Sequence, residues 1–274
     1  MNRLKKVTLF QKSILSFIFI SIFSFSAVVS QTSNKTNKNK VENKTPIVSN
    51  SITIKGIAPG ASGKTIKLVV FSDQINYIEK TIASAPIDTG GSFNISATIE
   101  KTTMAFLKID LCRSRIFLQP KTNYDLKLDP FDYNNPDEKN NSFIDPPELS
   151  YTITNSKEEL NLAIRDFDAM FYDFFIKNIG YIQRHKNKTR LDTFKLEVGE
   201  KFANIKDVFF TNYVKYKCGS IEDIAILDTK FKIGLKYFAN KPVLFDNVEY
   251  MTFFNDYFKK YLTSTATKVT PSDL

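Results

Sequence analysis

The chain has 274 residues and a formal net charge of +9, with one histidine, two cysteines and no tryptophan. Most of the positive excess lies in residues 1–46, and the rest of the chain is close to neutral. Because a nucleic-acid-binding protein concentrates basic residues on its folded part, this distribution argues against nucleic acid as a partner. Two cysteines are also too few for a small scaffold that is held together by disulfides.

Residues 1–30 have the three-part pattern of a secretory signal peptide. Residues 1–12 hold four basic residues and no acid, and residues 13–29 are apolar with scattered serines. We predict cleavage after Ser30, which gives a periplasmic or secreted chain. The apolar run is short, so we expect membrane contact only through an uncleaved signal. An exported chain works without ATP or NAD, so no nucleotide is expected as a partner.

Residues 31–50 are rich in Asn, Lys and Thr and have few large apolar groups. Such a segment buries too little surface to offset the entropy of ordering, so we predict a disordered tether.

From residue 51 to about residue 130, apolar and polar residues alternate, as in strands that bury one face. Turn residues divide this region into about seven runs, which predicts an antiparallel β-sandwich. Glycines between two alternating runs at 88–91 predict a hairpin at that point. The predicted strands are 52–57, 65–71, 81–87, 92–99, 104–111, 115–118 and 124–128.

Residues 131–150 are rich in Pro, Asn and Asp and are predicted to connect two domains. From 151 to 262 the apolar period becomes helical, which predicts an α-helical bundle and hence an α+β chain of two domains. A capping box at 156–159 starts the first helix. Further helices are expected at 191–217, with Gly219 as C-cap, at 221–238, and from Asn247 onward. The polar tail spans 263–274.

Residues 58–65, APGASGKT, resemble a relaxed phosphate-binding loop. Such a loop needs a helix N-terminus behind the phosphates, whereas the residues that follow alternate like a strand. We therefore interpret the segment as a Gly-rich turn between two strands.

The triplet Asp88-Thr89-Gly90 matches that of aspartic proteases, which need two carboxylates that share a proton. The sequence has no second such triplet, so a structural turn is the favoured interpretation. His185 lies in a basic stretch without Cys or carboxylate partners at ligand spacing and is expected to be an exposed loop residue. We assign no catalytic, cofactor-binding or metal-binding residue and expect no cofactor.

Cys112 and Cys218 fall in different predicted domains. They are interpreted either as buried thiols or as a disulfide, which would require the domains to dock there. In the last helix, aromatic residues occupy more than one face, which suggests a buried helix or a partner surface. The candidate surface consists of Tyr250, Phe253, Phe254, Tyr257 and Phe258.

Five stretches behind the predicted signal carry a family resemblance: ITIKG at 52–56, IDTGGSF at 87–93, FLQPKTNYDL at 117–126, YTITNSKEEL at 151–160 and NVEYMTFFNDYF at 247–258. Together they resemble the N-terminal half of the exported TlpA-type thiol–disulfide oxidoreductases of Bacteroidota. In that family a β-domain and a helical region precede a thioredoxin-like domain, which carries the catalytic Cys-x-x-Cys.

The sequence contains no Cys-x-x-Cys, so no catalytic residue of that family can be assigned here. The chain is therefore expected to be a fragment of a longer oxidoreductase or a stand-alone version of the accessory half. Our first hypothesis is a non-catalytic accessory region whose partner is a thioredoxin-like domain or an envelope client protein. The alternative is an independent cell-envelope module that binds a protein or a glycan.

Overall fold

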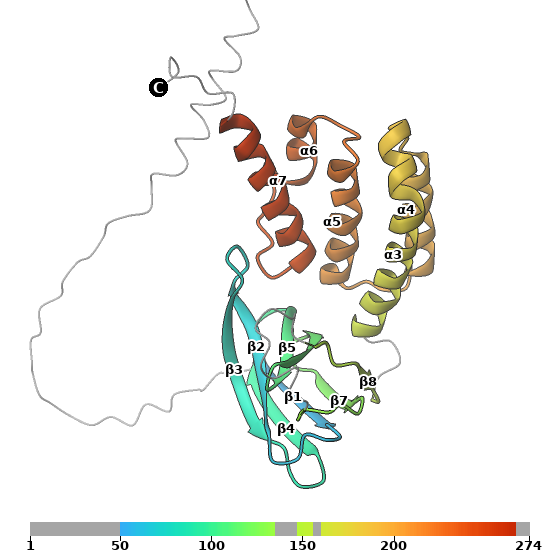
Figure 1. Cartoon of the computed structure of the whole chain (residues 1–274). Coiled ribbons are helices and arrows are strands. Elements are labelled where there is room, and N and C mark those ends of the chain that lie inside the picture. The colour runs from blue at the N-terminus through green and yellow to red at the C-terminus, as the bar shows by residue number, and fades with distance from the viewer. Residues whose placement is uncertain (1–49, 135–146, 156–159, 267–274) are drawn as a thin grey trace, which may run out of the picture. The chain divides into compact units, whose positions relative to one another are not determined.

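The computed structural model describes residues 50–134, 147–155 and 160–266, and side chains up to residue 259. Within these ranges the chain has an α+β fold, in which eight strands come before five helices (Figure 1). The strands are β1 (Ser51–Ile57), β2 (Thr65–Asp73), β3 (Ile78–Pro86), β4 (Ser92–Thr98), β5 (Thr103–Ile109), β6 (Cys112–Leu118), β7 (Asn123–Leu128) and β8 (Tyr151–Ile153).

The strands form two four-stranded sheets, with the orders β4-β1-β7-β8 and β3-β2-β5-β6. All pairs of named strands are antiparallel except one, because β1 and β7 run parallel, with Ile54 opposite Tyr124. The prediction of a purely antiparallel arrangement was therefore wrong at this pair. Alternation does not reveal strand direction, since a strand with one buried face shows the same pattern in either orientation.

The predicted hairpin at residues 88–91 was also wrong. β3 pairs with β2, and β4 pairs with β1, so the turn between β3 and β4 carries the chain from one sheet to the other. The turn is closed by its own groups: Asp88 N donates to Ser92 O at 2.9 Å, and Ser92 N donates to Asp88 Oδ1 at 2.7 Å. Glycine turns also suit such crossings, so the local signal did not identify the partner strand.

One apolar cluster contains inward-facing residues of both sheets, including Ile54 and Leu126 from the first and Leu68 and Leu107 from the second. The second sheet also buries residues on its other face. Val69, Met104, Phe106 and Phe117 belong to a separate cluster with side chains from the helices. The β5 strand is consequently buried on both faces, which explains its almost continuous apolar sequence.

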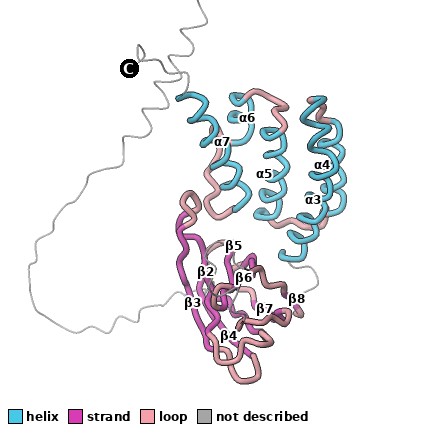
Figure 2. The backbone as a smooth tube through the Cα atoms, viewed as in Figure 1, coloured by secondary structure: helices cyan, strands magenta, loops and turns pink. Residues whose placement is uncertain are grey.

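The helices are α3 (Leu160–His185), α4 (Thr189–Lys201), α5 (Val208–Ile224), α6 (Lys230–Tyr237) and α7 (Val248–Ala266), shown in cyan in Figure 2. The predicted single helix over 191–217 is two helices, α4 and α5. Asp207 is the N-cap of α5, and its side chain accepts a hydrogen bond from Phe210 N at 2.8 Å. An acid at this position favours a new helix start over a continuous helix.

Gly219 does not cap a helix, as was predicted, but lies inside α5. The predicted helix over 221–238 is shortened to α6, because residues 225–229 form a turn in which Ile226 has a φ of 52°. Thr229 caps α6, and α7 extends to Ala266, into the predicted tail.

The predicted signal peptide, residues 31–49 of the tether, the capping box at 156–159 and most of the inter-domain connection lie outside the described residues. Within the described part of the chain, none of the helices combines the length and the apolar character needed to cross a membrane.

Candidate functional site

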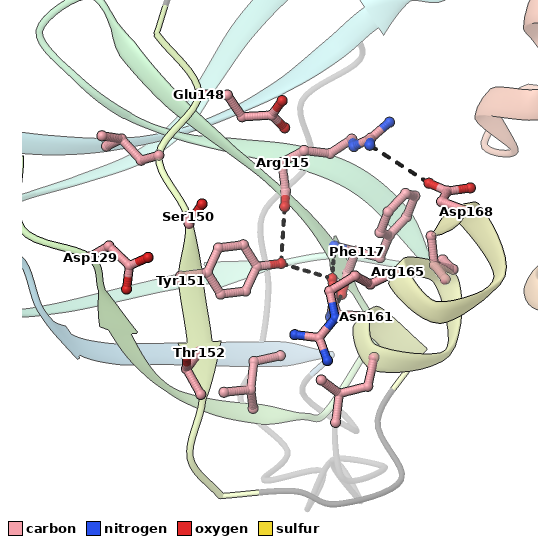
Figure 3. A pocket seen from close by; sticks show the side chains of 14 residues that line it. Arg115, Phe117, Asp129, Glu148, Ser150, Tyr151, Thr152, Asn161, Arg165 and Asp168 are labelled. Atoms are coloured by element: carbon pink, nitrogen blue, oxygen red, sulfur yellow. Dashed lines mark hydrogen bonds and ion pairs between the residues drawn. The ribbon is translucent and has the colours of Figure 1, made fainter. Parts of the chain in front are cut away.

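A groove of about 470 Å³ lies where β6 and β8 meet the first turns of α3, and we call it the junction groove (Figure 3). The segment 148–153 forms one wall and α3 residues between 161 and 168 form the other, with Arg115 and Phe117 of β6 between them. Residues from three distant parts of the sequence therefore line one hollow.

Asn161, near the start of α3, fixes one side of this groove. Its Oδ1 accepts a hydrogen bond from Phe117 N at 2.6 Å, and its Nδ2 donates to Phe117 O at 2.8 Å. Because β6 is an edge strand, these two backbone groups have no neighbouring strand to pair with. A side-chain amide can present an N–H donor and a C=O acceptor side by side, as a peptide group of a strand does, so it replaces that strand here.

The segment that starts at Pro147 covers another part of the β6 edge. Arg113 N donates to Pro147 O at 3.0 Å, and Leu149 N donates to Arg113 O at 2.8 Å. The hydroxyl of Tyr151 lies 3.0 Å from Arg115 O and 3.2 Å from Asn161 Oδ1, as the dashed lines in Figure 3 show. The groove is thus held by hydrogen bonds on both sides.

A network of charged side chains next to the groove joins β6 to α3, α5 and α7. Arg115 Nη2 lies 3.7 Å from Asp168 Oδ2, and Asp168 Oδ1 lies 2.7 Å from the ammonium of Lys217 in α5. The same ammonium lies 3.1 Å from Glu249 Oε1 of α7. One lysine therefore joins carboxylates of two different helices, and through Asp168 the network reaches the strands.

Tyr213 belongs to the same network. Its hydroxyl lies 3.0 Å from both carboxylate oxygens of Asp168. Burial, followed by the negative charges of Glu249 and Asp168, raises the pKa of Tyr213 well above its ordinary value. The phenol therefore stays neutral at physiological pH and serves as a hydrogen-bond donor to Asp168.

The mouth of the junction groove carries charges of both signs. Arg165 of α3 has a side chain that is 65% exposed, and its one ion pair among the described residues is with the adjacent Asp166. Asp129 and Glu148 lie exposed on the opposite wall (Figure 3). Accessible charges of both signs suit recognition of a polypeptide segment better than recognition of a uniformly charged ligand.

The two cysteines are held apart in the structure. Cys112 is buried in the cluster shared by the two sheets, and Cys218 is buried in the cluster shared by strands and helices. Both are thiols, so a disulfide between Cys112 and Cys218 is not formed. Burial raises the pKa of the Cys218 thiol to about 12. Because the thiolate is the reactive form, Cys218 is a poor nucleophile at neutral pH.

The aromatic residues of the last helix mostly form core. Tyr250, Phe253 and Tyr257 are each less than 5% exposed, so these three were wrongly included in a candidate partner surface. They pack with Tyr216 of α5 and Phe238 after α6, and the partly buried Phe254 and Phe258 contact the same cluster. The aromatic excess serves the contact between α5, α6 and α7.

The sequence motifs take structural roles. Residues 58–64 link β1 to β2, so the predicted turn between strands is confirmed, and the Lys64 ammonium pairs with Asp110 at 2.6 Å. Asp88 holds the turn between β3 and β4 through Ser92 N. His185 is exposed, as expected, but it is the last residue of α3 and its ring contacts Tyr181.

The residues of the network were not identified from the sequence, although Asp168 gave a usable signal. It lies four residues after Ile164 and three before Phe171, inside the apolar stripe of α3. An acid within a buried stripe requires a partner, because an unpaired buried charge is costly. Its partner Lys217 lies on another helix, far away in the sequence, so local sequence patterns do not identify the pair.

Among the residues that the structure describes, no group of three His, Cys, Asp or Glu side chains is placed to hold a metal ion. No protein-family model matches the chain, and comparison with curated proteins gave no significant match.

Proposed function

We propose that the chain is a non-catalytic accessory region of an exported thiol–disulfide oxidoreductase system, which binds a protein partner in the junction groove. The observation that carries this proposal is the groove itself. Its Arg165, Asp129 and Glu148 side chains are exposed, while Asn161 and the Asp168–Lys217 pair fix its walls. A rigid site with accessible charges of both signs is suited to a specific, reversible protein contact.

The state of the thiols supports an accessory role. Cys218 has a pKa of about 12, and both cysteines are buried. Thiol–disulfide exchange needs an accessible thiolate, so the redox chemistry of the system would belong to a partner. The family resemblance suggests a thioredoxin-like domain, or a client protein of the envelope, as that partner.

We also infer a finer arrangement of the fold. Strands β1 to β7 would form a β-sandwich domain over residues 51–130, and the helices would form a second domain within residues 151–262. The boundary expected at residue 151 is displaced, because β8 (Tyr151–Ile153) pairs with β7 and belongs to the first sheet. The apolar cluster common to both sheets supports the first part of this inference, because sandwich cores combine the inner faces of two sheets. Export to the periplasm or cell exterior remains part of the proposal.

The first test is binding to a thioredoxin-like protein of the same envelope, measured by calorimetry with Arg165→Glu as the variant. Reversing this exposed charge should weaken binding by about tenfold. The new carboxylate at position 165 would repel an acidic group of the partner that Arg165 attracts. Arg184→Glu is the matched control, since Arg184 is exposed near the far end of the same helix and should leave binding unchanged.

Two results would contradict the proposal. One is an equal loss of binding affinity in the Arg165→Glu and Arg184→Glu variants. The other is insulin reduction by the purified chain at a rate near that of a thioredoxin, since it would place redox chemistry in this chain. The intact mass of the endogenous protein would further separate an accessory region of a longer protein from a stand-alone module.

A further inference from the structure

A second hollow, of about 460 Å³, lies between α4, α5 and α6, and we call it the apolar groove. Its floor consists of the buried side chains Val198, Phe210 and Cys218. Its walls include the partly exposed side chains of Phe202, Ile205 and Val214. Its volume lies within the usual range of small-molecule sites, and its lining is mainly apolar, as is typical of such sites.

Lysines surround the mouth of this groove. Lys195 and Lys236 both bind the carboxylate of Glu222, at 2.7 Å each, and Glu222 is only 2% exposed. Lys215 is exposed on the groove wall, and no carboxylate pairs with it among the described residues. Its ammonium lies 5.0 Å from the ring centre of Tyr216. Three lysines and one carboxylate leave the mouth positively charged.

An apolar groove lined by lysines complements one kind of ligand, an apolar chain with an anionic head group. We propose that the apolar groove binds a fatty acid with an alkyl chain of about twelve carbons, with the alkyl chain against Phe202, Ile205 and Val214 and the carboxylate at Lys215 and Lys236. Burial of the alkyl chain supplies most of the affinity, since each methylene removed from water is favourable. The lysines select the anionic head group. This site is separate from the junction groove and does not depend on the function proposed for it.

Gly199 makes the proposal testable without disturbing the core. It lies on α4 at the groove, and a Cβ added there would meet no atom within 4 Å. Gly199→Leu should therefore fold normally and place its side chain in the groove. Gly180→Leu is the matched control, because a Cβ on Gly180 of α3 also meets no atom within 4 Å, but Gly180 lines neither the junction groove nor the apolar groove.

The experiment is calorimetric titration of the purified chain with laurate below its micellar concentration. We expect saturable binding, which Gly199→Leu weakens by about tenfold or more and Gly180→Leu changes by less than about twofold. Circular dichroism of each variant reports whether it folds.

The charge of the ligand is tested separately. Lys215→Gln should weaken laurate binding by about threefold to tenfold, while Lys55→Gln, on the exposed face of β1, should not change it. Dodecylammonium, which has the same chain length and the opposite charge, should bind more weakly than laurate.

Absence of saturable laurate binding would overturn the proposal, as would equal binding by Gly199→Leu and the unmodified chain. Equal affinities for laurate and dodecylammonium would also overturn it, because the lysines would then play no part in selection. If Gly199→Leu did not fold, the Lys215→Gln comparison would still decide the matter.

Discussion

The side chain of Asn161 pairs with both backbone groups of Phe117, over distances of 2.6 and 2.8 Å. Both residues are buried, at 7% and 3% exposure. This contact joins the start of α3 to the edge of the second sheet and fixes one wall of the junction groove. One amide therefore links the helices to the strands and closes a strand edge.

Replacing Asn161 by Leu should lower the free energy of unfolding by about 3 kcal/mol. Leucine has a similar size but cannot pair with the buried N–H and C=O of Phe117, and each unpaired buried group costs about 1–3 kcal/mol. Urea denaturation followed by circular dichroism measures the change. Asn178→Leu is the control, because the Asn178 amide donates to Phe174 O within its own helix and accepts from the exposed guanidinium of Arg190, so its loss strands no buried strand edge. Equal losses in both variants would argue against the role given to Asn161.

Gly219 should not tolerate a methyl group. A Cβ on this residue would lie 2.6 Å from Cε1 of Tyr237, whose ring is buried against α5. Gly219→Ala should therefore lower the melting temperature, although alanine is the better helix former by about 1 kcal/mol. Gly180→Ala should raise it, because the space there is open. Calorimetric melting of both variants would test the pair, and a rise with both would contradict the close packing.

Gly219 also illustrates what the sequence revealed and what it did not. The strand and helix regions and most strand positions followed from the period of apolar residues, because period depends on local burial. Glycine, in contrast, is compatible with a helix end and with close packing inside a helix. The choice between them depends on Tyr237, eighteen residues later, and no local pattern contains that information.

The same limit applies to the candidate site. Asp168 stands out as an acid in an apolar stripe, but Lys217 and Glu249 lie on other helices. The turn at 88–91 was predicted as a hairpin for the same reason, since its glycines do not specify which strands pair. Pairing of distant elements arises from packing, which sequence period does not encode.

Lys217→Met should destabilise the chain by about 2 kcal/mol, because it leaves the carboxylates of Asp168 and Glu249 without their shared cation. The Lys217 side chain is only 18% exposed, so water replaces its ammonium poorly. Adding Glu249→Gln to Lys217→Met should recover part of the loss, since one uncompensated charge is removed. Urea unfolding of the single and double variants measures both effects. A double variant that is less stable than Lys217→Met would contradict this account.

Alkaline pH should unfold the chain. Burial raises the pKa of Tyr250 to about 12 and raises that of Cys218 to the same value, while their ordinary values are 10.0 and 9.0. A group with a raised pKa in the folded state stabilises the fold fully below its ordinary pKa, and this contribution is lost as pH rises toward the folded value. The free energy of unfolding should thus fall between pH 9 and about pH 12.

The absorbance of ionised tyrosine, recorded together with circular dichroism, measures this transition. Ionisation of the buried tyrosines should coincide with loss of helix signal. Tyr250→Phe keeps the ring and removes the ionisable group, so it should make the fall in stability with rising pH less steep. Full tyrosine ionisation with an intact helix signal would contradict the burial of these phenols.

Glu222 should make the chain sensitive to acid. Burial alone would raise its pKa, but hydrogen bonds from Lys195 and Lys236 outweigh burial and lower the pKa below its ordinary value of 4.5. A lowered pKa in the folded state gives stability that is present above the ordinary value and is lost as pH falls through the folded value. Glu222→Gln removes this ionisation, so its free energy of unfolding should change less between pH 7 and about pH 3 than that of the unmodified chain. Urea unfolding at both pH values tests this, and identical changes in the two proteins would show that Glu222 does not determine acid stability.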